Sequence, residues 1–309
     1  MPMNSAERIA LVKTALGKEP FDTIISDVQV VNVYSNEIIP GAIGIKYGRV
    51  VSFRVKENAP AQERFSARGM YALPGFIDTH VHIDSTLLTP EGLVELIAPH
   101  GTTALFADPM EIANVAGLEG LKALFVGTQR IPCHVYLEIP SRVPTAPGLE
   151  TTGGELDLDD VRELLQWKQT ISLGELDPSK ILGLRSEYFE KIEAAQKIGK
   201  IANGHAIGLS GADLEAYACG GLSDDHECVT FEEAKNRIEL GLAVLIREGS
   251  TERNLDALVQ GIIREKADTH NWMMCTDDKH PNEILREGHI NYMVNKSIAL
   301  GLEPIRAIQ

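Results

Sequence analysis

From Ala72 onward, short apolar segments that suit β-strands alternate with segments that suit helices. The strand-like segments fall at 75–78, 103–107, 134–139, 171–174, 201–204, 222–225, 243–246 and 272–275. Helix-like segments lie between them, for example at 158–168, 187–197, 211–218, 231–240 and 254–265. Alternation of this kind predicts a parallel sheet. Because eight such units occupy about 200 residues, the sequence favours a closed (β/α)8 TIM-type barrel of the α/β class over an open sheet.

The chain before this alternation has a different character. Residues 5–17 carry apolar side chains roughly on one face and predict a helix, so 1–20 is expected to form an N-terminal helical segment. Residues 21–72 are rich in β-forming residues, with a turn expected at Tyr47-Gly48. We therefore expect a small antiparallel sheet over 21–72, followed by the barrel over 73–309.

Charge and cysteine usage exclude several classes of protein. With 29 basic and 44 acidic residues the net charge is −15, and no basic cluster favours nucleic acid or an anionic membrane. No apolar stretch approaches the ~20 residues that a membrane span needs, and the N-terminal segment lacks the pattern of a signal peptide. The four cysteines are scattered, without a Cys-x-x-Cys pair. They predict free thiols in a reduced, cytoplasmic protein.

Polar residues gather where the predicted strands end. His80 and His82 come two residues apart at the end of the first apolar run, and in extended chain residues with this spacing point to the same face. Further candidates follow later strands, namely Glu175, His205, His226 and Asp277. In a barrel these strand ends converge on one mouth, where active sites lie.

Four histidines and two carboxylates make a complete ligand set for one or two divalent metal ions. Mixed imidazole and carboxylate ligands suit Zn, Fe or Mn better than Ca or Mg. The expected chemistry is a metal-bound water that acts as hydroxide near neutral pH. Glu227 and Asp277 are the candidates for acid–base catalysis.

Each of these residues also has a structural explanation. Glu175 could be a surface carboxylate, His205 a buried structural histidine, and Asp277 a helix cap. Asp108, before Pro109, could start a turn. Their joint position, each at the end of a different predicted strand, favours the metal site.

The segment Pro-Gly-Phe-Ile-Asp-Thr-His-Val-His-Ile-Asp-Ser at 74–85 resembles the opening of the amidohydrolase superfamily. More narrowly, the chain resembles the bacterial and archaeal adenine deaminases from residue 21 onward. The motifs that carry this resemblance lie at 99–104, 107–117, 140–144, 204–211, 223–228, 246–250 and 275–281.

The resemblance implies a (β/α)8 barrel with a small β-sandwich, of which 21–72 would supply one half. It also implies a binuclear metal centre, with Mn or Fe favoured and Zn as an alternative, that converts adenine and water to hypoxanthine and ammonia. Carried onto this sequence, His80 and His82 would hold the first metal, Glu175 would bridge, and two further histidines would hold the second metal, namely His205 and His226. Asp277 would ligate or take a proton from the attacking water, and Glu227 would protonate ring nitrogen N1.

Two departures from the family pattern lie near the expected site. Met110 stands where the family usually has histidine, and Leu176-Asp177-Pro178 replaces the usual Met-Asn after the bridging glutamate. Candidates for contact with the purine-like substrate are Asp108, Met110, Glu111, Arg247 and Asp278.

The family continues with the rest of the sandwich and a C-terminal part. The chain is therefore expected to be a piece of a longer protein, or to be completed by a second chain or a homo-oligomer. Two alternatives remain open: an amidohydrolase that cleaves a cyclic amide or another C–N bond, and a truncated, inactive member of the family.

Overall fold

The computed structural model describes residues 3–309, which divide into two compact units. The first unit comprises the chain up to Pro74 together with Pro304–Gln309, and the second comprises Gly75–Glu303. No helix in the described part of the chain is long and apolar enough to cross a membrane. All four cysteines are free, as the sequence predicts.

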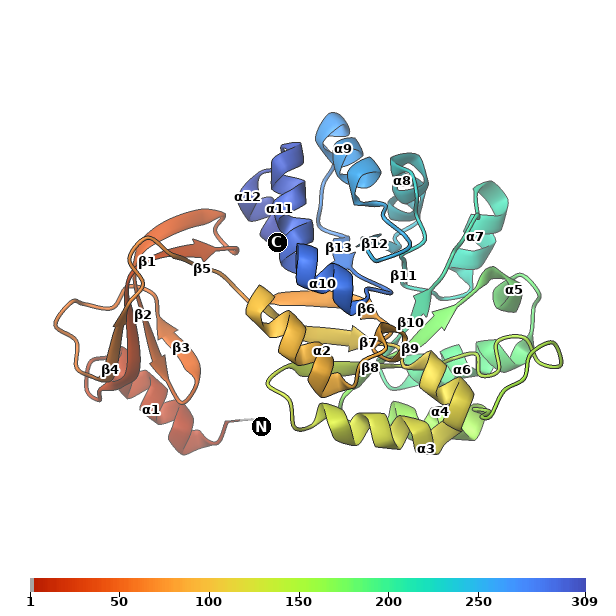
Figure 1. Cartoon of the computed structure of the whole chain (residues 1–309), viewed down its shortest axis with the longest axis horizontal. Coiled ribbons are helices and arrows are strands. Elements are labelled where there is room, and N and C mark those ends of the chain that lie inside the picture. The colour runs from red at the N-terminus through yellow and green to blue at the C-terminus, as the bar shows by residue number, and fades with distance from the viewer. Residues whose placement is uncertain (1–2) are drawn as a thin grey trace. The chain divides into compact units, whose positions relative to one another are not determined.

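Eight strands form the centre of the second unit (Figure 1), and every strand pairing within it is parallel. They lie in two sheets, ordered β10-β9-β8-β7-β6 and β11-β12-β13. The strands are β6 (Phe76–Val81), β7 (Thr102–Ala107), β8 (His134–Ile139), β9 (Thr170–Leu176), β10 (Ile201–Gly204), β11 (Asp224–Asp225), β12 (Ala243–Arg247) and β13 (Trp272–Cys275). The eight predicted strands are confirmed, and β8, β10 and β13 have the predicted bounds.

The two sheets adjoin at both edges. At one junction the Ser223 amide donates to the Ala202 carbonyl at 2.9 Å. At the other, the Asp277 amide donates to the His80 carbonyl at 3.0 Å, and the His82 amide donates to the Asp277 carbonyl at 3.1 Å. The strands thus follow one another around the unit in chain order, which is consistent with the expected barrel.

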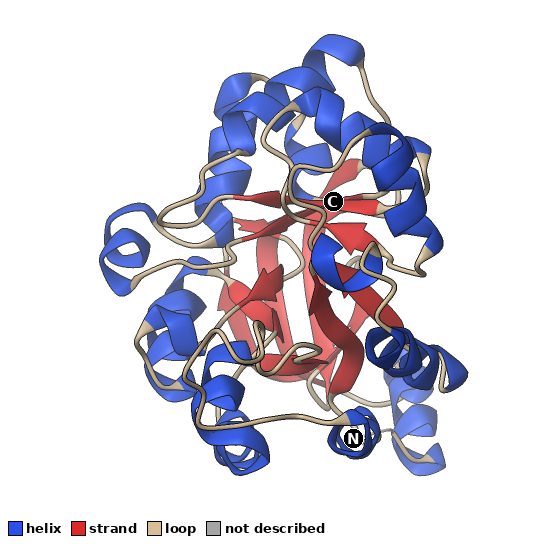
Figure 2. Ribbon diagram, turned by 90° about the vertical axis from the view of Figure 1, so that its right-hand side faces the viewer, coloured by secondary structure: helices blue, strands red, loops and turns tan. Residues whose placement is uncertain are grey.

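Helices surround these strands (Figure 2). They are α2 (Pro90–Ile97), α3 (Met110–Thr128), α4 (Leu158–Leu165), α5 (Pro178–Ile181), α6 (Ser186–Lys197), α7 (Gly211–Cys219), α8 (Phe231–Glu239), α9 (Leu255–Glu265), α10 (Pro281–Glu287) and α11 (Ile290–Leu300), with 3-10 turns η1 (Asp84–Thr86) and η2 (Ala98–His100). Strands whose outer faces are covered by helices are typically apolar. β7, β8 and β9 are mainly apolar, whereas β11 consists of two aspartates. Leu105, Ile139 and Leu173 are almost fully buried in this core.

The first unit is a five-stranded sheet of order β3-β2-β1-β4, with β5 also paired to β1. Its elements are α1 (Ser5–Ala15), β1 (Phe21–Asn32), β2 (Glu37–Lys46), β3 (Arg49–Ser52), β4 (Ala61–Ser66), β5 (Tyr71–Ala72) and α12 (Pro304–Ile308). The prediction of an antiparallel sheet is wrong for β4 and β5, which both run parallel to β1. After β3 the chain crosses to the far side of β1, and a crossover of this kind is what a pair of parallel strands requires.

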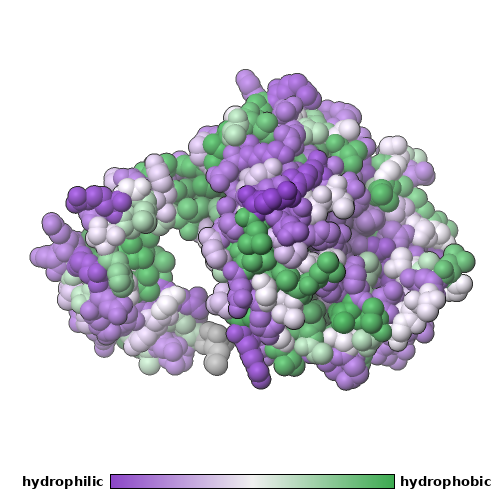
Figure 3. All heavy atoms as spheres, viewed as in Figure 1, coloured by the Kyte–Doolittle hydropathy of each residue, from purple (hydrophilic) through white to green (hydrophobic). Residues whose placement is uncertain are grey.

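The turn predicted at Tyr47-Gly48 is confirmed. Both residues have positive φ, 50° and 66°, the conformation of the two-residue turns whose twist matches a hairpin. Several apolar side chains of this sheet remain exposed, among them Ile38 (45%), Val50 (65%) and Phe65 (55%). Hydrophobic residues are visible on the surface of this unit in Figure 3.

Candidate metal centre

The six predicted metal ligands and Glu227 all lie at the C-terminal ends of strands. His80 belongs to β6 and Glu175 to β9, while the others directly follow β6, β10, β11 or β13. Because the strands are parallel, these ends meet on one side of the sheets. The structure brings all seven side chains into one network of contacts, as the strand register predicts.

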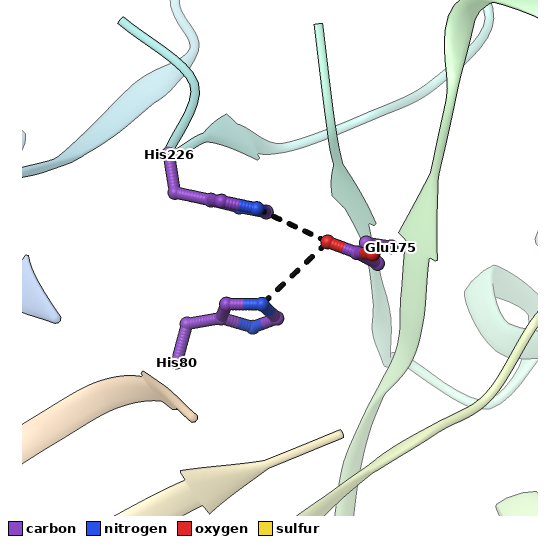
Figure 4. A group of neighbouring side chains, drawn as sticks. All are labelled: His80, Glu175 and His226. Atoms are coloured by element: carbon purple, nitrogen blue, oxygen red, sulfur yellow. Dashed lines mark ion pairs between the residues drawn. The ribbon is translucent and has the colours of Figure 1, made fainter. Parts of the chain in front are cut away.

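One oxygen of Glu175 is the meeting point of three imidazoles. Glu175 Oε2 lies 3.1 Å from His226 Nε2, 3.1 Å from His205 Nδ1 and 3.5 Å from His80 Nε2. Figure 4 shows the imidazoles of His226 and His80, one above the other, facing this oxygen. Glu175 is 3% exposed. A buried carboxylate with three nitrogens on one oxygen is a charged group that needs positive charge beside it.

Asp277 closes the other side of the centre. Its Oδ1 lies 3.5 Å from His82 Nε2 and 3.8 Å from His80 Nε2. The residue has a φ of 57°, and its backbone pairs with His80 and His82 across the junction of the two sheets. The same backbone contacts therefore close the ring of strands and place the Asp277 carboxylate beside two imidazoles.

Glu227 lies beside the second pair of histidines. Its Oε1 is 3.4 Å from His226 Nε2 and 3.6 Å from His205 Nδ1. Arg247 contacts both oxygens of Glu227 and also lies 2.9 Å from Asp277 Oδ2. The two predicted acid–base residues thus share one buried guanidinium.

The far nitrogens of the first two histidines are engaged. His80 Nδ1 pairs with Glu138 Oε2 at 2.7 Å, and His82 Nδ1 donates to the Asp108 carbonyl at 2.7 Å. Acceptors behind an imidazole fix the tautomer and ring orientation of metal-binding histidines. Both rings therefore turn Nε2 toward the centre.

These residues fit a divalent metal. Three groups of donors each lie within 4.8 Å of one another, namely His80–Glu175–His226, His80–His82–Asp277 and His205–His226–Glu227. Among the described residues, the buried Nε2 of His80 has no hydrogen-bond partner, which a ligand atom awaiting a metal would show. Imidazole and carboxylate donors match Zn, Fe or Mn.

The electrostatics of the protein alone agree with this fit. Burial opposes protonation of His80, but the charges of Glu138 and Glu175 raise the pKa of His80 well above its usual value. Burial likewise opposes ionisation of Glu175, yet the neighbouring imidazoles of His205, His226 and His80 hold the pKa of Glu175 well below its usual value. The cluster holds carboxylates that require neighbouring cations, and a metal ion would take the place of the imidazole protons.

Sequence comparison places this centre in a known family. The model of the amidohydrolase family matches residues 71–297, which include all of these candidate ligands. The chain belongs to the amidohydrolase family. This assignment covers the second unit, where the eight parallel strands and the cluster lie.

Two curated relatives are similar to almost the whole of this chain. An adenine deaminase of Desulforamulus reducens is 55% identical over 298 residues, which are 96% of this chain and 51% of that protein. An adenine deaminase of Desulfitobacterium hafniense is 39% identical over 308 residues, 99% of this chain and 53% of that protein. The chain therefore spans about half the length of the curated relatives it matches.

Among solved structures, a crystal structure of an adenine deaminase superposes with a TM-score of 0.66. The matched region covers 93% of this chain and 81% of the chain in that crystal structure, at 15% sequence identity. At this identity the likeness supports the fold of the amidohydrolase alone.

The five candidates for substrate contact lie around the cluster in different settings. Asp108 is buried, accepts from the Glu175 amide at 3.2 Å, and has its pKa raised to about 8, chiefly by burial. Glu111 Oε2 lies 3.4 Å from His82 Nδ1, and Met110 Sδ lies 3.9 Å from the Thr145 hydroxyl. Arg247 pairs with Glu227 and Asp277 as described above, and Asp278 accepts from the Ser85 hydroxyl.

Sequence reasoning missed two side chains that hold the centre in place. Glu138 supports His80, and Arg142 contacts both the side chain and the backbone carbonyl of Glu175. Glu138 lies near the end of the strand predicted at 134–139, so the rule that led to the other residues applies to it as well. Arg142 follows the same strand by three residues, and nothing in its spacing pointed to Glu175.

Proposed function

We propose that this amidohydrolase hydrolyses adenine, or a closely related aminopurine, to hypoxanthine and ammonia. The observation that carries the proposal is the buried oxygen of Glu175 surrounded by three imidazoles. The 55% identity to a protein named adenine deaminase supports the choice of substrate. The closed (β/α)8 barrel, with the centre at the C-terminal ends of its strands, is part of this proposal.

The centre would hold one or two divalent metal ions, with Mn or Fe favoured and Zn as an alternative. His80, His82 and Asp277 would hold one ion, His205 and His226 the other, and Glu175 would lie between them. When bound, the metal supplies Lewis-acid activation of a water molecule near neutral pH.

Asp277 and Glu227 would move the protons. Burial opposes ionisation of Asp277, but the charges of His226, His80 and His82 lower its pKa to about 2. The Asp277 carboxylate is therefore ionised near neutral pH and suited to take a proton from the attacking water. Glu227, which shares Arg247 Nη1 with Asp277, would deliver a proton to ring nitrogen N1 as C6 becomes tetrahedral.

Several coarser features belong to the same proposal. The sheet of the first unit would form half of a β-sandwich. Its exposed apolar residues support the idea that another polypeptide segment or a second copy of this chain covers the sheet. The free thiols support a reducing, cytoplasmic setting. The net charge of −15 supports a small-molecule substrate over nucleic acid.

A second candidate is hydrolysis of a cyclic amide or another C–N bond by the same centre. Two observations favour it. Met110 places a thioether next to Thr145 where the resembled family usually has an imidazole. Asp177 adds a carboxylate 3.4 Å from Arg142, which changes the charge near Glu175 from what an amide side chain would give.

One assay separates these candidates. Purified chain loaded with Mn²⁺ is offered adenine, other aminopurines and a set of cyclic amides, while ammonia and the adenine-to-hypoxanthine absorbance change are recorded. We expect ammonia release from adenine or one close aminopurine, and loss of it in Glu227→Gln. Turnover of a cyclic amide without ammonia release from any purine would replace the proposal by the second candidate.

A further inference from the structure

Two buried arginines contact the carboxylates of the centre at the oxygens that do not face the histidines. Arg142 and Arg247 are 7% and 5% exposed. Arg142 Nη2 donates to Glu175 Oε1, and Arg247 Nη1 donates to Asp277 Oδ2 at 2.9 Å. In both carboxylates the other oxygen is the one that faces the histidines.

This division of oxygens is the same on opposite sides of the cluster. Glu175 turns Oε2 to its imidazoles and Oε1 to Arg142, while Asp277 turns Oδ1 to its imidazoles and Oδ2 to Arg247. A free carboxylate can rotate and present either oxygen or both. A guanidinium donor on one oxygen removes that freedom, because it stabilises one orientation of the group.

Arg142 is itself held at three nitrogens. Its Nε donates to the Glu175 carbonyl at 3.2 Å and its Nη1 to Asp177 Oδ2 at 3.4 Å, in addition to the contact of Nη2 with Glu175. Asp177 is fixed in turn, because it caps α5 through the Ser179 amide at 2.9 Å. Lysine could not reproduce this fork of donors.

We propose that Arg142 and Arg247 are positioning residues that assign one oxygen of Glu175 and of Asp277 to the metal ions and keep the other away from them. This inference rests on the metal centre of the proposed function. It goes beyond that function because it concerns residues that contact neither the metal nor, in the case of Arg142, any predicted acid–base group. Arg247 thereby acquires a role other than the substrate contact expected from the sequence.

Two physical effects of each arginine oppose one another. Its positive charge repels a divalent cation nearby, whereas its hydrogen bonds hold the ligand oxygen in place. If repulsion dominates, removal of the arginine raises metal affinity. If positioning dominates, removal lowers it, and a lysine that keeps the charge without the fork also lowers it.

The test is a titration of the metal-free chain with Mn²⁺, in which the electron paramagnetic resonance signal of free Mn²⁺ measures the dissociation constant. A parallel series measures competition by Zn²⁺. The variants are Arg142→Met, Arg142→Lys, Arg247→Met and Arg247→Lys. Arg162→Met is the matched control, since Arg162 is an exposed residue of α4 paired with Asp159. Circular dichroism and thermal unfolding of the metal-free proteins show whether each variant folds. Where a methionine variant does not fold, the lysine variant at the same position provides the test.

We expect about 10- to 100-fold weaker binding in the arginine variants, the scale known for groups that orient metal ligands, and no change in Arg162→Met. Unchanged or tighter binding in folded variants of either arginine would overturn the assignment for that residue while leaving the proposed function in place. Absence of metal binding by the parent chain would overturn the proposed metal centre and this inference together.

Discussion

A buried ion pair supports the strand end from which His226 and Glu227 project. Arg237 of α8 donates from Nε to Asp225 Oδ2 at 2.9 Å, and the two residues are 1% and 0% exposed. Asp225 Oδ1 accepts from the Glu227 amide at 3.1 Å. The remaining arginine nitrogens donate to the backbone carbonyls of Leu209 and Ala206 and, at 3.4 Å, to that of Glu233.

Arg237→Met would leave the Asp225 carboxylate buried without its cationic partner, and the carbonyls of Leu209 and Ala206 without the arginine donors. Breaking a buried pair in this way costs about 3–5 kcal/mol. For a folded unit of this size each kcal/mol lowers the unfolding midpoint by about 2–4 °C. We therefore expect the midpoint to fall by ~6–20 °C.

Thermal unfolding of the metal-free chain, monitored by circular dichroism, measures this shift. Arg237→Lys retains the charge and should fall between the parent and Arg237→Met. Arg264→Met, at a largely exposed position, should change stability by no more than ~0.5 kcal/mol. A midpoint in Arg237→Met within 2 °C of the control would refute the reasoning, because the pair would then carry no net stability.

Three further predictions concern the centre. Glu227→Gln should retain metal but lose about 100-fold or more in rate; activity within a few-fold of the parent in steady-state assays would pass the proton role to Asp277 or Glu111. Glu138→Gln should weaken Mn²⁺ binding by about 10- to 100-fold, because a neutral amide replaces the carboxylate behind His80, and equal affinity by titration would assign Glu138 no part in the centre. Met110→His should raise kcat/KM for adenine, since a partner for a buried polar atom is worth ~1–3 kcal/mol; parent turnover near ~10 per second would show that Met110 does not limit the reaction.

The pattern of the second unit could be predicted because each strand and helix satisfies its own local signal. Buried parallel strands are mainly apolar, and β8, β10 and β13 have the bounds predicted for them. β11 is shorter than predicted, Asp224–Asp225 in place of 222–225. The mixed pairing of the first unit could not be predicted, because strand direction depends on the path of the chain between β3 and β4 and not on the composition of either strand.

The candidate ligands could be predicted for the same reason. The C-terminal ends of parallel strands lie on one side of the sheet, which lets polar residues there come together, as His80, Glu175 and His226 do. Arg142 and Arg247 are 33 and 30 residues away in the sequence from the carboxylates that they contact, Glu175 and Asp277. Each contact depends on which oxygen of the carboxylate the guanidinium reaches. The spacing of residues along the chain does not indicate which oxygen is contacted, so these hydrogen bonds are known only from the three-dimensional structure.

Elemental analysis of the purified protein by mass spectrometry tests most directly whether these strand ends hold divalent metal. The parent chain is compared with His82→Ala and with His270→Ala, whose side chain is 93% exposed and outside the cluster. We predict about one to two equivalents of divalent metal in the parent and in His270→Ala, and loss of metal together with activity in His82→Ala, because its ligand set is incomplete. Full metal content in His82→Ala, or none in the parent after Mn²⁺ loading, would contradict the account.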